Sequence, residues 1–214
     1  MTHNISLPEY LKDPCGTCST AFWKNTTFIR PDNTQIIHEK ELSGIEVSNS
    51  KISRYFRLYH NLRDIVESTL PNGLLYQTVN LQNDLDAVCR ILNQCYPNMN
   101  INSDEVIKWT QYKAFCPDLW VFICKENIDD KIALAIADYD NEASEISLEW
   151  VQVLPEYQKQ GLGTKLVNEL LNRACRYADF ATVSGQVDNV NHPEFLSRKC
   201  GFTGKDIRCL IHNT

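Results

Sequence analysis

The sequence predicts an α/β fold in which a mixed central sheet carries helices on both faces, with an extension ahead of it. From residue 74 onward, segments with the two-residue period of strands alternate with segments of helical period, in the order β-α-α-β-β-β-α-β-α-β. Residues 1–73 are less regular, and Pro71-Asn72-Gly73 is a turn signal. We therefore expect an N-terminal extension, 1–73, packed on a main domain, 74–214.

The composition is that of a globular protein that does not bind nucleic acid. Of 214 residues, 43% are hydrophobic and 22% are charged, and the formal net charge is −6 at pH 7. An acidic surface disfavours nucleic-acid and anionic-membrane partners. The start MTHNISLPEY lacks the features of a secretion signal, and the longest aliphatic run, 132–137, is too short to cross a bilayer. We therefore expect a cytoplasmic protein with no membrane partner.

The cysteines are typical of reduced thiols. There are nine of them, an odd number, scattered singly through apolar segments. Cys15 and Cys18 form a Cys-x-x-Cys pair, but two thiolates need two further ligands to hold zinc, and the five histidines show no paired spacing. We predict no metal site; a metal or redox role for this pair is the alternative.

The extension contains short elements whose role the sequence does not state. The expected elements are one or two helical turns at 7–12, short strands at 26–29 and 35–38, and a clearer strand at 55–60. Phe22 and Trp23 place two large aromatic rings in a short span, which indicates that the extension packs on the main domain. An ordinary structural role without chemistry is the simpler expectation for this segment.

The elements of the main domain follow from apolar period and from punctuating residues. Strands are expected at 75–79, 119–124, 131–139, 145–154, 181–187 and 206–211, and helices at 82–95, 103–115, from 161 onward and at 193–200. Ser103 is a good N-cap for the second helix. Pro155 ends the fourth strand because proline cannot donate to a ladder. In the third helix, Leu162, Leu166 and Leu170 recur every fourth residue.

The loop before that third helix is suited to an anion. The first turn of a helix leaves N–H groups unpaired and attracts negative charge. Gly161 and Gly163 allow a phosphate to approach the main chain, Lys159 adds a positive charge, and Leu162 is expected to turn into the core. We therefore predict that a diphosphate is held by the loop residues Gln158, Lys159, Gln160, Gly161, Leu162, Gly163 and Thr164.

The strand at 145–154 changes its apolar phase. Ile146, Leu148 and Trp150 alternate on even positions, whereas Val151 and Val153 are apolar on odd positions. A one-residue phase shift predicts a β-bulge, which exposes main-chain groups. The alternative is a strand buried on both faces, which needs no bulge.

These residues carry a family resemblance. The string VLPEYQKQGLGT at 153–164, followed by a Leu-rich helix, resembles the acetyl-CoA-binding motif of the GNAT acetyltransferases and departs from it only at Gln160. The string PCGTCSTAFWK at 14–24 resembles the start of a poorly characterised bacterial subset of them. The resemblance implies the GNAT fold and acetyl-CoA as cofactor. It also implies that Val151, Gln152 and Val153 bind the pantetheine arm, where the strand splays from its neighbour.

A second stretch, 189–202, resembles the other GNAT signature, in which an Asn precedes a short helix ending in Gly-Phe. The resemblance implies that Asn189 or Asn191 hydrogen-bonds near the cofactor's arm, and the spacing does not choose between them. Many family members have a tyrosine, proposed as general acid, where this chain has Ser197. Water or another tyrosine, such as Tyr139, would then serve, and weak or absent activity is the alternative.

The chemistry that the resemblance implies is acyl transfer to an amine. An alkylamine is mostly protonated at neutral pH, so a base is needed. Glu149 lies beside the predicted bulge and is our candidate for the base or for the anchor of a relay water; an ordinary solvated carboxylate is the alternative. Glu145 shares its strand face, and we expect it to be solvated. The backbone N–H near Val151 is a candidate donor to the thioester oxygen.

Two functions from different classes follow. The first is an enzyme that moves an acetyl group from acetyl-CoA to a primary amine of a small molecule or a protein. A homodimer is one option for its oligomeric state. The second is a non-catalytic CoA-binding sensor or scaffold protein.

Overall fold

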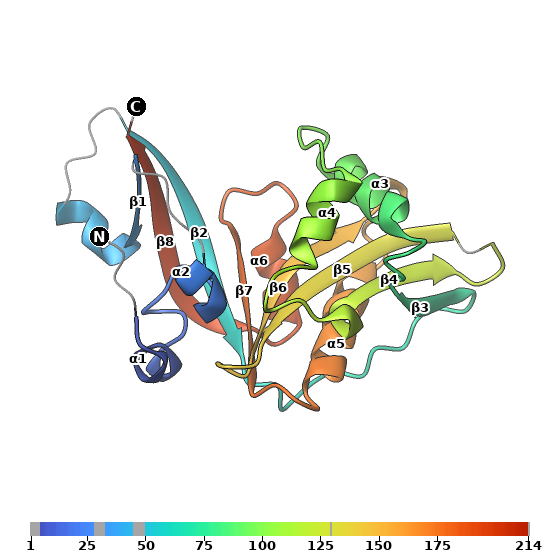
Figure 1. Ribbon diagram of the computed structural model, residues 1–214, viewed down its shortest axis with the longest axis horizontal. Helices are drawn as coiled ribbons and strands as arrows, with labels where there is room; N and C mark the ends of the chain where they lie inside the picture. The colour runs from blue at the N-terminus through green and yellow to red at the C-terminus, as the bar shows by residue number, and fades with distance from the viewer. Residues whose placement is uncertain (1–4, 28–32, 45–49, 129, 214) are drawn as a thin grey trace.

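The computed structural model describes residues 5–27, 33–44, 50–128 and 130–213, and it is built around one eight-stranded sheet (Figure 1). The strand order is β1-β8-β2-β7-β6-β5-β4-β3. The strands are β1 (Thr34–His38), β2 (Ser50–His60), β3 (Leu74–Thr78), β4 (Trp120–Lys125), β5 (Asp130–Asp140), β6 (Glu145–Val153), β7 (Phe180–Gln186) and β8 (Thr203–Asn213). β6 and β7 run parallel and the other neighbours antiparallel, so the predicted mixed sheet is confirmed.

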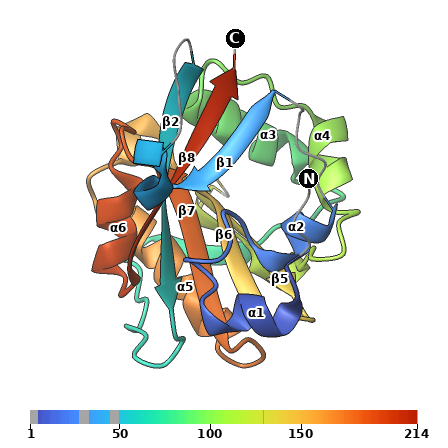
Figure 2. The same cartoon turned by 90° about the vertical axis from the view of Figure 1, so that its left-hand side faces the viewer.

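Helices cover both faces of the sheet, as predicted. They are α1 (Leu7–Lys12), α2 (Phe22–Thr27), α3 (Leu85–Cys95), α4 (Ser103–Trp109), α5 (Leu162–Ala174) and α6 (Pro193–Lys199), with 3₁₀ turns at Glu39–Gly44, Pro117–Leu119 and Pro155–Tyr157. Figure 2 shows α5 and α6 on one side of the sheet and α2, α3 and α4 on the other. A separate apolar cluster fills each side: Leu166 and Leu170 of α5 belong to the first, and Ile91 and Leu92 of α3 belong to the second.

Three details of the sequence prediction are wrong. The N-cap of α4 is Asn102, which forms a capping box with Glu105, rather than Ser103. The predicted helix 103–115 ends at Trp109, because the chain turns there and brings Tyr112 against Trp23, with ring centroids 5.3 Å apart. Of the predicted strand at 26–29, the described part belongs to α2, and residues 28 and 29 lie outside the described residues.

The N-terminal segment contributes strands to the sheet. β2 lies between β7 and β8 and pairs antiparallel with both, and β1 extends the sheet beyond β8. These ladders satisfy backbone hydrogen-bonding groups of β7 and β8, which a segment resting on the surface would not do. Strands from both sides of residue 73 thus belong to one sheet. The division into an extension, 1–73, and a main domain, 74–214, stays a prediction.

A buried polar network fixes α1 over the middle of the sheet. Arg57 and Glu145 are 2% and 1% exposed, and the Arg57 guanidinium lies 3.2 Å from Glu145 Oε1. The Tyr10 hydroxyl donates to Glu145 Oε2 at 2.7 Å, and Thr182 also donates to this carboxylate. Glu145 is therefore not the solvated carboxylate that its sequence position suggested. Its neighbours come from three separate parts of the chain.

Candidate functional site

The two central strands part at Glu149. β6 pairs with β7 from Glu145 to Leu148, and the last pair is Leu148 with Val183. On the other edge, Leu148 pairs with Ala137 and Trp150 with Ile136, so Glu149 is the extra residue of a β-bulge. The predicted bulge is confirmed, one residue before the phase change that indicated it. From Glu149 to Val153, no strand formed by the described residues lies along the edge of β6 that faces β7.

The backbone of β6 presents polar groups to this opening. The Leu154 N–H donates to the Ile132 carbonyl at 3.0 Å, toward β5. Because alternate residues of a strand direct their N–H and C=O groups to opposite edges, Val151 and Val153 direct theirs toward the opening, whereas Gln152 pairs toward β5. The Gln158 side chain donates to the Val153 carbonyl at 3.0 Å and so fixes the following loop to the end of β6.

The first turn of α5 is open to solvent. Gly161 is its N-cap, with φ of +81°, and no side chain among the described residues caps the helix. Residues 158–161 are exposed, and a Cβ at Gly161 would meet no described atom within 4 Å. Leu162 is 2% exposed and anchors the helix in the core, as predicted. A Cβ at Gly163 would lie 3.3 Å from a Leu196 methyl group, which shows how closely α5 approaches α6.

The residues of the second signature lie between β7 and α6. Asn189 Oδ1 accepts the Asn191 N–H at 2.9 Å, and the Asn189 carbonyl accepts the His192 N–H at 2.9 Å. Asn189 is half-buried and Asn191 is exposed. Asn189 therefore organises the turn before α6, and the choice between the two as cofactor ligands stays open.

Both Ser197, which stands where many family members have a tyrosine, and Tyr139, the suggested substitute acid, hydrogen-bond within the protein. Ser197 is 4% exposed, and its hydroxyl donates to the Pro193 carbonyl of its own helix at 2.9 Å. Tyr139 packs with the α5 cluster, and its hydroxyl donates at 3.0 Å to the carbonyl of Tyr177, beyond the C-terminal end of α5. The suggestion that Tyr139 replaces the missing tyrosine is therefore wrong, since this ring lies at the wrong end of that helix.

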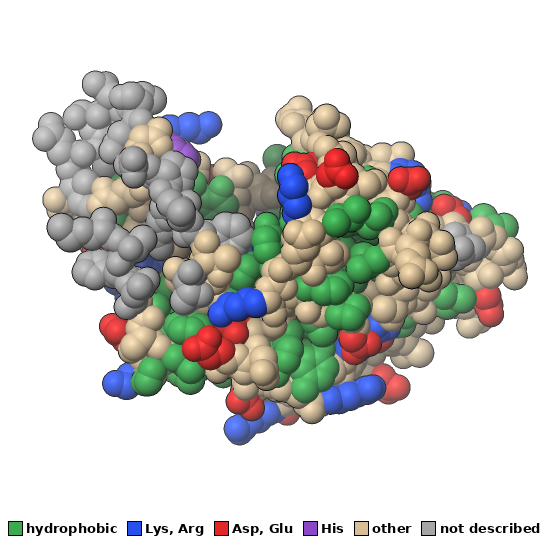
Figure 3. All heavy atoms as spheres, viewed as in Figure 1, with side chains coloured by type: hydrophobic (Ala, Val, Ile, Leu, Met, Phe, Trp, Pro, Cys, Tyr) green, Lys and Arg blue, Asp and Glu red, His purple; other side chains and the backbone are tan. Residues whose placement is uncertain are grey.

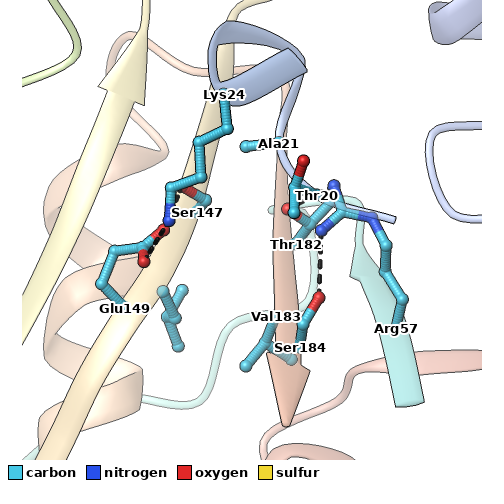
Figure 4. A pocket seen from close by; sticks show the side chains of 10 residues that line it. Thr20, Ala21, Lys24, Arg57, Ser147, Glu149, Thr182, Val183 and Ser184 are labelled. Carbon is cyan, nitrogen blue, oxygen red and sulfur yellow. Dashed lines mark hydrogen bonds and ion pairs between the residues drawn. The ribbon is translucent and has the colours of Figure 1, made fainter. Parts of the chain in front are cut away.

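A small cavity occupies the fork where β6 and β7 part (Figure 4). Its volume is about 90 Å³. Ser147, Leu148 and Glu149 of β6 line one side, and Thr182, Val183 and Ser184 of β7 line the other. Thr20, Ala21 and Lys24 of the N-terminal segment also line it.

A larger cavity of about 270 Å³ lies next to the first and is lined mainly by aromatic rings. All four tryptophans of the chain take part: Trp23, Trp109, Trp120 and Trp150. Trp109 and Trp150 stack at 20° with centroids 5.8 Å apart. Figure 3 shows hydrophobic side chains gathered on the face of the molecule that α4 covers, with acidic and basic side chains around them.

Lys24 and Glu149 line both cavities and form an ion pair between them (Figure 4). The Lys24 ammonium donates to Glu149 Oε2, and the Ser147 hydroxyl donates to Oε1 at 3.0 Å. Each charged side chain is 23% exposed. The pair therefore stands where the small cavity at the fork meets the aromatic cavity.

A second carboxyl group, Asp138, lines the aromatic cavity. It is 7% exposed. Burial, helped by the nearby Glu149 carboxylate and opposed by the Lys24 ammonium, raises the pKa of Asp138 to about 8. The buried Asp138 carboxyl group therefore lies beside the Glu149–Lys24 ion pair in the wall of the same cavity.

Sequence reasoning missed Asp138 and Lys24 for different reasons. Asp138 continues the apolar face formed by Ile132, Leu134 and Ile136, and a carboxyl group on a buried face is costly, so a signal was present. Lys24 meets Glu149 across 125 residues, and no local pattern records such a contact.

Other kinds of site find no support in the described part of the chain. No group of three or more His, Cys, Asp or Glu side chains converges there as metal ligands would, and Cys15 and Cys18 are buried free thiols. In those same ranges, no helix has the length and apolarity that crossing a membrane requires.

The comparisons with known proteins agree with this fold. Residues 117–204 match the family described as the acetyltransferase (GNAT) domain, and no curated protein matches the chain. A GCN5-related N-acetyltransferase from Sphaerobacter thermophilus superposes with a TM-score of 0.71 at 15% identity, over 83% of this chain and 58% of that one. This chain thus spans little more than half of that protein.

Two further solved structures are similar at lower scores. A GCN5-related N-acetyltransferase from Kribbella flavida has a TM-score of 0.57 at 17% identity, over 84% of this chain and 67% of that one. The ribosomal-protein-S18-alanine N-acetyltransferase from Escherichia coli has a TM-score of 0.51 at 17% identity, over 65% of this chain and 92% of that one. At such identities the likeness establishes the fold and not the substrate.

Proposed function

We propose that the chain transfers an acetyl group from acetyl-CoA to a primary amine of a small molecule or a protein, because residues 117–204 match the acetyltransferase (GNAT) domain and the fold is similar to that of GCN5-related N-acetyltransferases. The observation that supports this most directly is the position of Glu149. It lies at the fork of β6 and β7 and lines two adjoining cavities, so an acyl donor on one side and an amine on the other would meet beside its carboxylate.

The residues present fit a CoA molecule. The loop 158–164 offers the uncapped N–H groups of α5, the open approach at Gly161 and the exposed charge of Lys159, all of which suit a diphosphate. Val151 and Val153 offer backbone groups to a pantetheine arm in the opening, and Asn189 or Asn191 would stand beside it. Acetyl-CoA, when bound, supplies the activated acyl group as a thioester.

Glu149 and Asp138 together provide an acceptor for the proton that the amine must lose. An amine enters as an ammonium ion, and the negative charge of Glu149 attracts it. The amine must lose a proton before it attacks the thioester carbonyl, and the Glu149–Asp138 pair can accept that proton, directly or through a water. A C–N bond then forms and the C–S bond breaks. A free thiol has a pKa of about 8.5, so the departing thiolate needs little help from an acid, which fits the position of Ser197 away from the fork.

Amine-dependent thiol release tests the proposal. The full chain is mixed with acetyl-CoA and a panel of primary amines, free thiol is followed with a colour reagent, and the acetylated amine is identified by mass spectrometry. We expect thiol to appear only when an acceptor is present. Tight CoA binding by calorimetry without thiol release from any amine would favour the second candidate, a non-catalytic CoA-binding sensor or scaffold, for which the occupation of Glu149 by Lys24 is the supporting observation.

A further inference from the structure

The aromatic cavity has the chemistry of a specific amine site. Its walls come from distant segments: Trp23 from α2, Trp109 from α4, and Trp120 and Trp150 from the sheet. Because every tryptophan of the chain lines this one cavity, the cavity offers broad apolar surfaces against which an aromatic ring can stack or pack edge-on.

The inner end of the same cavity is built for a cation. Asp138 and Glu149 are its two acidic side chains, and Lys24 is the basic one. The Lys24 ammonium contacts the Glu149 carboxylate and lies 5.5 Å from the centre of the Trp23 ring. An ammonium ion at this point is therefore held by a carboxylate and by the face of an indole, the two partners that cations prefer. Lys24 shows where the ammonium of a ligand would be held.

The volume limits the size of the ligand. An apolar cavity of about 150 Å³ holds a benzene molecule. The aromatic cavity, at about 270 Å³, has room for one such ring and a short alkyl chain ending in an amine. Glu149 lies at the border with the fork, so the amine of such a ligand would sit at the side where the acyl group is expected.

We propose that the acceptor is a small primary amine carrying an aromatic ring, whose ring lies against the tryptophans and whose ammonium takes the place of Lys24 at Glu149. The acceptor role rests on the proposed acetyl transfer, whereas the binding of such an amine does not. Lys24 then acts as an internal competitor, which leaves Glu149 when the ligand enters.

Tryptophan fluorescence tests the binding directly, because all four indoles line the cavity. The full chain is titrated with 2-phenylethylamine, with 2-phenylethanol, which has the ring but no charge, and with n-butylamine, which has the charge but no ring. We expect saturable changes in emission, with 2-phenylethylamine binding at least tenfold more tightly than either control. Equal binding of n-butylamine, or no saturable change with 2-phenylethylamine at millimolar concentration, would overturn the proposal.

The affinities of single-residue variants test where 2-phenylethylamine binds. Trp109→Ala should weaken 2-phenylethylamine at least tenfold, whereas Phe195→Ala, which truncates a 73% exposed ring on α6, should leave its affinity unchanged. Lys24→Met should tighten binding severalfold, because the competing ammonium is gone; an unchanged or weaker affinity would show that the amine binds elsewhere. Circular dichroism of each variant confirms that it is folded before affinities are compared.

Two further measurements distinguish a failure of the proposed aromatic ligand class from a failure of the proposed acetyl transfer. Phenylalaninamide imitates a peptide N-terminus, and binding as tight as that of 2-phenylethylamine would overturn the assignment to a small free amine. Thiol release is then measured with the same compounds and acetyl-CoA. Tight binding of 2-phenylethylamine without thiol release would refute acetyl transfer alone, and thiol release with n-butylamine but not with 2-phenylethylamine would refute the aromatic class alone.

Discussion

Glu145 and Glu149 are four residues apart on β6, and each forms an ion pair with a cation from the N-terminal segment, yet their surroundings differ. The Glu145 side chain is 0% exposed and meets Arg57, Tyr10 and Thr182. The Glu149 side chain is 23% exposed and meets Lys24 beside two cavities. β6 is paired with β7 at the first residue and has parted from it at the second.

The comparison teaches that strand pairing decides which charge is structural. Where β6 and β7 are joined, no ligand can enter, and the buried charges are satisfied by the protein itself. Where they part, the Glu149 carboxylate borders two cavities and pairs with the partly exposed Lys24. Four predictions test this difference, from the largest expected effect to the smallest.

Glu145→Gln should lower the free energy of unfolding by about 3–5 kcal/mol, because it leaves the Arg57 guanidinium buried without its counter-charge. Glu149→Gln should cost no more than about 1 kcal/mol, since its ion pair is partly solvated. Urea unfolding at pH 7 measures both. Equal losses of unfolding free energy in the two variants would contradict a structural role for Glu145 that Glu149 lacks.

The effects on activity should be the reverse of those on stability. Glu149→Gln should reduce amine-dependent thiol release about 100-fold at neutral pH, at the lower end of what a general base contributes, and less at high pH, where the free amine is more abundant. Glu126→Gln, which changes an exposed carboxylate in a turn, is the control and should have no effect. A Glu149→Gln pH–rate profile identical in shape to that of the wild type would remove this residue from the proton transfer.

Asp138→Asn should change the dependence of both activity and stability on pH. The pKa of Asp138 is raised to about 8 in the folded protein, against about 3.9 in an unfolded chain. The folded state therefore favours the protonated form, and this contribution to stability is full below pH 4 and is lost as pH rises to about 8. The variant should thus gain stability relative to the wild type across that range, and its pH–rate profile should lose any step that the wild type shows near pH 8.

Thermal unfolding between pH 4 and pH 9 measures the stability difference between the wild type and Asp138→Asn. A constant difference across that range would contradict the raised pKa. Glu126→Gln again serves as the control, because its exposed carboxylate should give a small difference at every pH.

Lys159→Ala should have the smallest effect. A surface charge beside a helix N-terminus contributes about 0.3–1 kcal/mol, so the affinity for CoA should fall up to about fivefold, and the loss should shrink in high salt. Lys40→Ala, in the extension, should leave the affinity unchanged. Isothermal titration calorimetry measures both, and an unaltered affinity of Lys159→Ala would show that this charge does not face the diphosphate.

Local patterns were sufficient for much of the fold and for one side of the candidate site. The spacing of Leu162, Leu166 and Leu170 indicated α5, and Gly161 indicated the open approach to its first turn. The phase change in β6 indicated the bulge at Glu149. Such features are recorded in neighbouring residues, because helix period, strand alternation and turn conformation act over a few positions.

The aromatic cavity proposed to bind the amine could not be predicted from local sequence patterns. Trp23 and Lys24 belong to the string 14–24, whose resemblance implied no role for either residue, and the four tryptophans are spread over more than 120 positions. Asp138 was partly visible as an acid on an apolar face, but its raised pKa comes first from burial and then from the nearby Glu149 carboxylate, and both depend on the assembled sheet.

By itself, the sequence determined the elements of the α/β domain, the open glycine loop at α5 and the bulge in β6, since each depends on residues close together in the chain. Only the tertiary structure decided that β2 enters the sheet between β7 and β8, that Glu145 is buried while Glu149 borders two cavities, and that α2 completes an aromatic site. Those outcomes depend on contacts between segments far apart in the chain, and such contacts form only when the whole sheet has assembled.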